Sequence, residues 1–190
     1  MDAVKTVDYK GYTIAVHQDT DATSPDDWGN EDLFLITTRN RYFEVQRKGF
    51  DLDDAASGVY KKDYHVIPLI AYCHSGVSLS LSSDRYPFND QWDAGQIGFV
   101  LVKKRQGFRD INKAAESLVE EWNDYLSGNV YGYIVADADG EDTDMSCSGF
   151  YGDPDKYMIP EVKAEIDAVI KRDTERVITS AGDVPLEARA

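Results

Sequence analysis

Two segments in the second half of the chain carry apolar residues at helical spacing, and this pattern constrains the fold most. The first predicted helix runs from about Asp110 to Leu126, with Asp110 as N-cap and Gly128 just past its end. The second runs from Ile159 to about Ile178, with Pro160 in its first turn. The expected buried stripes are Ile111, Ala115, Leu118, Trp122 and Tyr125 in the first helix, and Val162, Ile166, Val169, Ile170 and Val177 in the second. Each helix therefore needs another layer to cover its stripe.

Strand and turn signals supply that layer. Val130–Val135 and Met145–Tyr151 flank Asp139-Gly140, a strong hairpin signal, and Lys10-Gly11 predicts a second hairpin near the N-terminus. The other expected strands are Thr6–Tyr9, Tyr12–His17, Leu33–Thr37, Arg41–Gln46, Tyr64–Tyr72, Val77–Leu81 and Gln96–Lys103, and the expected polar loops are Asp19–Asn30 and Asp51–Gly58. Pro68 indicates that its strand has an edge or a bulge at that point.

The fold class that follows is α+β. We predict an antiparallel sheet of several strands and hairpins, with the two helices of the C-terminal half packed on one face. The length of 190 residues fits one domain over residues 1–182, with residues 183–190 as a flexible tail. No apolar run reaches the roughly 18 residues that span a bilayer, and the first residues lack the apolar core of a signal peptide. With two cysteines only, the composition favours a cytoplasmic protein.

The negative charge is concentrated in parts of the chain. The formal net charge is −15, and residues 110–155 hold twelve acidic residues against one basic residue, Lys113. Residues 34–109, in contrast, hold eleven basic and eight acidic residues. Such a field repels nucleic acid and membrane surfaces and attracts basic patches on other proteins. We therefore expect no direct binding to nucleic acid or membrane.

The first helix arranges part of this charge as a ladder. Glu116, Glu120 and Asp124 stand at i, i+4 and i+8, opposite the apolar stripe, and Glu121 lies beside them. Carboxylates four residues apart are separated by about 6 Å along the helix axis. One interpretation is an ordinary solvated helix face. The other is a rigid surface that imitates a phosphate strand and occupies a nucleic-acid-binding groove of another protein.

The predicted hairpin tip carries five more acids: Asp137, Asp139, Glu141, Asp142 and Asp144. A calcium-binding EF-hand loop requires glycine at position 6 and glutamate at position 12. Counted from Asp137, those positions hold Asp142 and Ser148. The tip is therefore interpreted as an exposed turn, with a weak cation site as the alternative, and we predict no metal and no cofactor.

A small group of residues suggests a catalytic alternative. His74, Asp93 and Cys147 have the chemistry of a base, its orienting acid and a nucleophile. Cys73 is next to His74, but adjacent side chains on a strand point to opposite faces, so these two should not pair. Nothing in the local spacing requires Cys147 to meet His74. We expect no nucleophile–base pair, and enzyme activity is the less favoured hypothesis.

Three short motifs and a linking segment resemble a group of uncharacterised phage and mobile-element proteins. The motifs are Tyr72-Cys73-His74-Ser75-Gly76, Trp92-Asp93-Ala94-Gly95-Gln96-Ile97-Gly98-Phe99 and Ser146-Cys147-Ser148-Gly149-Phe150-Tyr151-Gly152, and the linking segment is Tyr125-Leu126-Ser127-Gly128-Asn129-Val130-Tyr131-Gly132. The resemblance covers residues 64–152 and assigns no activity to any residue. It implies a genomic context in which acidic proteins often counter host restriction or CRISPR systems.

These observations lead to one main expectation and one alternative. The main expectation is an acidic cytoplasmic inhibitor of the anti-restriction or anti-CRISPR type, a nucleic-acid mimic whose partner is the basic surface of a host nucleic-acid-binding protein. Its binding residues would be the helix ladder and the hairpin tip. The alternative is a small enzyme or ligand-binding domain centred on His74, Asp93 and Cys147. The oligomeric state is left open by the sequence.

Overall fold

The computed structural model describes residues 2–39, 41–81, 93–104 and 108–182, with the side chains of residues 177–182 excepted. The chain divides into two compact units, described separately below. The first unit combines residues 1–19 with residues 131–190, and the second consists of residues 20–130. The predicted tail, residues 183–190, lies outside the described residues.

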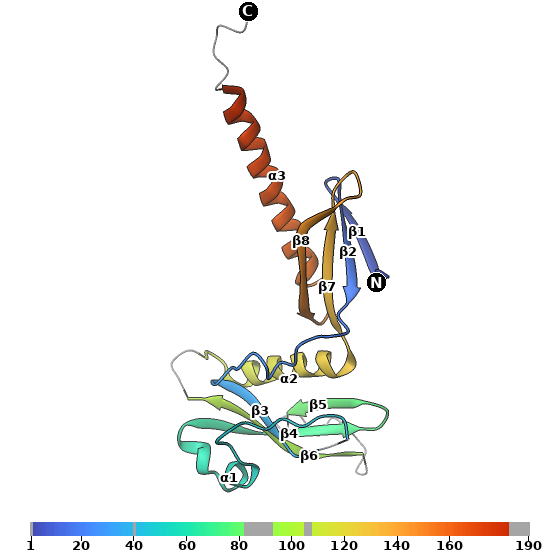
Figure 1. The fold of residues 1–190 in the computed structure, drawn as a ribbon. Helices are drawn as coiled ribbons and strands as arrows, with labels where there is room; N and C mark the ends of the chain where they lie inside the picture. The colour runs from blue at the N-terminus through green and yellow to red at the C-terminus, as the bar shows by residue number, and fades with distance from the viewer. Residues whose placement is uncertain (1, 40, 82–92, 105–107, 183–190) are drawn as a thin grey trace, which may run out of the picture. The chain divides into compact units, whose positions relative to one another are not determined.

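The α+β class predicted from the sequence is confirmed. Within the described residues there are eight antiparallel strands and three α-helices, two of them in the C-terminal half. The strands form two four-stranded sheets rather than the single sheet that the sequence suggested (Figure 1). The helices likewise do not share one sheet, because each packs on the sheet of its own unit.

The first unit contains the sheet β1-β2-β7-β8 and helix α3 (Met158–Gly182). Its strands are β1 (Lys5–Tyr9), β2 (Tyr12–Gln18), β7 (Val130–Ala136) and β8 (Asp142–Tyr151). Ile14 pairs with Val135, so both side chains lie on the face that α3 covers with Val162 and Ile166. The predicted stripe is thus buried at Val162 and Ile166 and half-buried at Val169 and Ile170, while the side chain of Val177 is not among those described.

Both predicted hairpins belong to this sheet. Tyr9 pairs with Tyr12 across Lys10 and Gly11, which have φ values of 50° and 84° and so make the tight turn. At the second turn, Asp137 N donates to Glu141 O at 2.9 Å, and Gly140 has a φ of 81°. The hairpin between β7 and β8 around Asp139-Gly140 is therefore confirmed.

The second unit contains the sheet β3-β6-β4-β5 with helices on both faces (Figure 1). Its elements are β3 (Leu33–Thr37), α1 (Leu52–Ser57), η1 (Val59–Lys62), β4 (Tyr64–Cys73), β5 (Val77–Leu81), β6 (Ala94–Lys103) and α2 (Ile111–Ser127). Ala115, Leu118 and Trp122 of α2 pack on one face, as the apolar periodicity predicted. Ala55 of α1 and the ring of Phe34 lie in the core of the other face.

Helix α2 is fixed at both ends and at its middle. Asp110 is the N-cap and accepts a hydrogen bond from Lys113 N at 3.1 Å, and Gly128 ends the helix with a φ of 74°. Asn123 holds the backbone of Leu79 in β5 with a pair of hydrogen bonds. Its Oδ1 accepts from Leu79 N at 2.7 Å and its Nδ2 donates to Leu79 O at 3.0 Å. The predicted caps are confirmed, and the helix is a rigid support.

Two local predictions in this unit were wrong. Residues 41–46 do not form a strand. Val45 is held at the end of β3 by Thr37, whose backbone N–H donates to Val45 O and whose side-chain Oγ1 accepts from Val45 N. The expected loop Asp51–Gly58 contains the short helix α1. Asp51 caps it by accepting from two backbone N–H groups, and Gly58 closes it with a φ of 87°. Asp51 and Gly58 are also typical turn residues, and for this reason the sequence predicted a loop where helix α1 lies.

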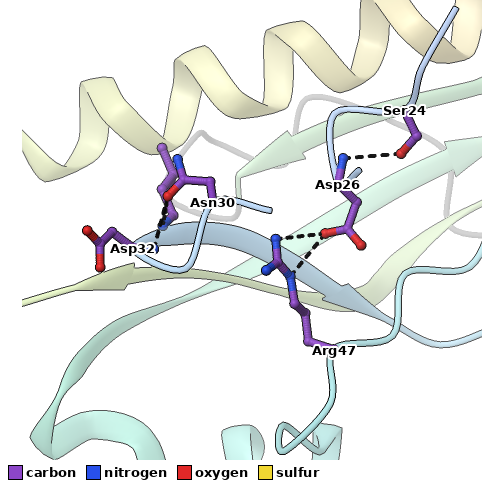
Figure 2. A network of polar contacts seen from close by, with 6 residues as sticks. Ser24, Asp26, Asn30, Asp32 and Arg47 are labelled. Atoms are coloured by element: carbon purple, nitrogen blue, oxygen red, sulfur yellow. Dashed lines mark hydrogen bonds and ion pairs between the residues drawn. The ribbon is translucent and has the colours of Figure 1, made fainter. Parts of the chain in front are cut away.

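The polar loop before β3 is anchored by a network around Arg47 (Figure 2). Arg47 Nε donates to Asp26 Oδ1 at 3.1 Å, while Nη2 lies 3.0 Å from the same oxygen without hydrogen-bond geometry. The guanidinium also lies 4.7 Å from the ring centroid of Phe34. Ser24 Oγ accepts from Asp26 N, and Asn30 Oδ1 accepts from Asp32 N. Arg47 thus links the loop to Phe34 of β3, while the two local hydrogen bonds fix the turns of the loop itself.

Candidate functional site

The acidic ladder of α2 is only partly exposed. Glu116 and Glu120 are exposed, whereas Glu121 and Asp124 are half-buried. Among the ion pairs between described residues, none involves Glu116, Glu120 or Glu121. The helix thus presents two fully accessible carboxylates one turn apart, with two more beside them. A cationic surface could neutralise this charge.

Glu121 shows the cost of gathering these charges. Burial, and then the negative charges of Asp124 and Glu120, raise the pKa of the Glu121 carboxyl above its ordinary value. A carboxyl with a raised pKa in the folded state favours folding at low pH and opposes it as the pH rises through that pKa. A positive partner near the ladder would relieve this unfavourable interaction.

The hairpin tip of the first unit carries the other acidic group. Asp137 stabilises the turn, because its Oδ1 accepts from Asp139 N and Glu141 N, each at 3.0 Å. The side chains of Asp139, Glu141, Asp142 and Asp144 are exposed. Of the five acids at the predicted tip, Asp137 therefore stabilises the turn and the other four are exposed to solvent. The tip and the ladder belong to different units, so their joint action as one binding surface stays a prediction.

Metal-binding clusters and membrane-spanning helices are both absent from the described part of the chain. No group of three or more His, Cys, Asp or Glu side chains there is placed to hold a metal ion. None of the helices in these ranges combines the length and apolarity needed to cross a membrane.

His74 and Asp93, two of the three residues in the catalytic alternative, meet in the second unit. His74 Nδ1 donates to Asp93 Oδ2 at 2.8 Å, since a carboxylate only accepts. The contact follows from the pairing of β4 with β6, in which Cys73 N donates to Asp93 O at 2.8 Å. The His74 side chain is 68% exposed. In the neutral ring, this arrangement leaves Nε2 as an acceptor open to solvent.

The two cysteines differ in their surroundings. Both are free thiols, Cys73 half-buried in the second unit and Cys147 exposed in the first. Cys73 packs against the hydrophobic core under α2. Burial, together with the negative charge of Asp93, raises the pKa of the Cys73 thiol, which disfavours the reactive thiolate. The pairing of Cys147 with His74 stays untested, because the two residues lie in different units.

Two aromatic residues contact His74, and neither was proposed as a site residue from the sequence. The ring of Tyr72 is stacked with His74 at a centroid distance of 6.3 Å, and Tyr42 Oη donates to His74 O at 3.1 Å. The i, i+2 spacing of Tyr72 and His74 was the only signal available, since residues two apart share a face of a strand. Tyr42 comes from a separate segment that the sequence wrongly predicted to be a strand.

Comparison of the chain with protein-family models, curated proteins and solved structures finds no match in any of the three.

Proposed function

We propose that the protein is an acidic binding protein that competes with nucleic acid for a basic groove of a partner protein. The ladder of α2 is the observation that carries the proposal. Glu116 and Glu120 are exposed, lie one turn apart and have no ion-pair partner among the described residues. Their support is rigid, since α2 is capped at both ends and bonded to β5 through Asn123.

Rigidity matters because a mimic must present its charges without a large loss of entropy on binding. Like charges at i, i+4 cost a helix about 0.2–0.5 kcal/mol per pair, and a basic partner removes that cost. The motif resemblance to mobile-element proteins favours a host defence protein that binds DNA or RNA as this partner.

Ordinary solvation and adaptation to high salt account less well for the acidity. A solvated helix face would usually pair glutamates with lysines at i, i+4, and in this helix Lys113 is the single basic residue. Adaptation to high salt would spread acids over the whole chain, whereas residues 34–109 hold eleven basic and eight acidic residues. A function for the concentrated charge accounts for this uneven distribution.

The test is capture from a nuclease-treated host lysate on the immobilised full chain. A mimic should retain a nucleic-acid-binding protein that duplex DNA or RNA displaces and that is released as salt rises from about 50 to 200 mM. Substituting Glu116→Gln, Glu120→Gln and Asp124→Asn together should weaken binding and reduce its dependence on salt concentration. Folding should be retained, because the substitutions relieve repulsion.

The matched control is Asp27→Asn, Glu31→Gln and Asp63→Asn, three exposed acids of the same unit. It makes the same change in net charge without altering Glu116, Glu120 or Asp124 and should bind like the parent. Equal binding by the ladder variant and the parent would refute the proposal. So would a captured partner that binds the protein and the nucleic acid at the same time.

A second candidate function is favoured by the contact between His74 and Asp93. A histidine held at Nδ1 by a carboxylate, with Nε2 open to solvent, has the arrangement of a general base or a ligand-binding imidazole. His74→Gln would abolish an activity at this site while leaving capture through the ladder unchanged. The two functions are therefore separable by one substitution.

A further inference from the structure

A groove of about 390 Å³ lies in the second unit beside the first half of β4. Four consecutive strand residues, Tyr64–Ile67, line it together with Lys61, Lys104, Ile111 and Asn112. Consecutive side chains of a strand point to opposite faces, so a hollow that touches all four follows the edge of the strand. The first turn of α2 forms the opposite wall.

This edge of β4 has no strand beside it among the described residues. β5 pairs with β4 only over Leu69–Cys73, which leaves Tyr64–Pro68 paired with β6 alone. Lys104 N donates to Asp63 O at 2.8 Å, so the backbone of Asp63 faces β6. By the alternation of an antiparallel pair, the N–H and C=O groups of Tyr64 and Val66 face the groove.

Pro68 agrees with this assignment. Pro68 follows Tyr64 and Val66 in the alternating series of residues whose backbone groups face the open edge. Its missing N–H would point to that edge, where no hydrogen bond between strands is lost. A register shift between Leu69 and Ile70 follows immediately, where the pairing with β5 begins. The edge or bulge that Pro68 predicted from the sequence is thus observed, and the edge is confined to the first half of the strand.

The residues that line the groove indicate what kind of ligand it can bind. Lys61, Lys104 and His65 place positive or protonatable groups along it, while Ile67 and Ile111 supply apolar contacts. Asp63 and Asp110 are the nearest acids in sequence, and the side chain of Asp110 is engaged as the N-cap of α2. Main-chain groups in a row are recognised by another extended backbone. The net charge of −15 works against nucleic acid as the anionic ligand.

We infer that an extended acidic segment of a partner protein binds in this groove as an added strand beside Tyr64 and Val66. Its backbone pairs with theirs, its alternate apolar side chains contact Ile67 and Ile111, and its carboxylates face Lys61 and Lys104. This site is independent of the acidic ladder, which attracts a surface of the opposite charge.

The test uses the full chain and two octapeptides, one alternating Glu and Val and one alternating Lys and Val. The Glu-Val peptide should shift the Tyr64 and Val66 amide signals in NMR spectra and slow their hydrogen exchange about tenfold, and the Lys-Val peptide should do neither. Lys61→Glu should weaken binding about fivefold, as expected for the loss of a rim charge pair. Lys48→Glu, the same change at another exposed lysine of this unit, should leave it unchanged.

Equal effects of the two peptides, or shifts confined to other residues, would overturn the inference. Slowed exchange at Tyr64 and Val66 caused by a single-stranded oligonucleotide, or by self-association of the protein, would overturn it as well. None of Glu116, Glu120 and Asp124 lines the groove, and removal of their charges can only lessen repulsion of an acidic peptide, so the Glu116, Glu120 and Asp124 variant should bind the Glu-Val peptide at least as tightly as the parent. Peptide binding and partner capture by this variant therefore distinguish a failure of the groove proposal from a failure of the proposed function.

Discussion

Substitution of Gly98 by alanine should destabilise the second unit far more than the same substitution at Gly95, the other glycine of β6. Gly98 pairs with Thr37 of β3 on one side and with Leu69 of β4 on the other. A Cβ atom at this position would lie 2.0 Å from Ile36 O and 2.8 Å from Thr37 Cα. Both are backbone atoms, so no rotation of a side chain can remove the clash.

The size of the effect follows from these distances. Ordinary van der Waals contact begins at 3.4 Å, so β3 must move away from β6 by roughly 1.4 Å to accept the methyl group. β3 cannot move freely, because Leu35 lies in the core on one face of the sheet and Phe34 and Ile36 lie in the core on the other. Overpacking usually costs about 1–3 kcal/mol, and a clash between backbones should reach about 3 kcal/mol or more.

Urea denaturation followed by tryptophan fluorescence measures this change selectively. All three tryptophans of the chain lie within residues 20–130, so the signal reports the second unit. The control is Gly95→Ala in the same strand, where a Cβ atom has no neighbour within 4 Å. This variant should be neutral or up to about 1 kcal/mol more stable. If the two variants unfold within about 1 kcal/mol of each other, the close packing of β6 against β3 is refuted.

Three further outcomes are expected. Burial and the Glu165 carboxylate raise the pKa of Tyr133 to about 12. The contribution of Tyr133 to stability is therefore lost as the pH rises from about 10 through 12. Absorbance at 295 nm, with the Tyr133→Phe variant subtracted as a blank, should show that Glu165→Gln lowers the pKa of Tyr133. Asn123→Ala leaves the Leu79 backbone without its two side-chain bonds and should cost about 1–3 kcal/mol in thermal unfolding. Arg47→Met keeps an apolar side chain beside Phe34 but removes both the cation–π contact with that ring and the ion pair with Asp26, and urea denaturation should show a loss of about 1–2 kcal/mol.

Elements with strong local signals were predictable from the sequence. Helix α2 has a continuous apolar stripe, an N-cap and a C-terminal glycine, and these signals all lie within some 20 residues. The hairpin at Asp139-Gly140 is equally local. Helix α1 failed this test, because six residues give less than two turns of periodicity and its caps are also turn residues. Residues 41–46 failed for another reason: alternation predicts a strand only where a partner strand is available.

The division into two sheets depends on pairings between distant parts of the chain. Thr13 of β2 pairs with Ala136 of β7, so the first unit combines the two ends of the sequence. No linker separates α2 from β7, since β7 begins at Val130, directly after the turn that closes α2. A single sequence therefore shows the strands and helices, but not which sheet each of them joins.

The candidate sites also differ in how much of each the sequence predicts. The acidic ladder follows from helical periodicity alone, so Glu116 and Glu120 could be named before the structure was known. The contact of His74 with Asp93 depends on the register of β4 against β6, and the groove beside Tyr64 and Val66 depends on where β5 stops. Both properties are set by strand pairing. Local spacing gives the residues that can act, and pairing decides which backbone and side-chain groups are left accessible to a partner.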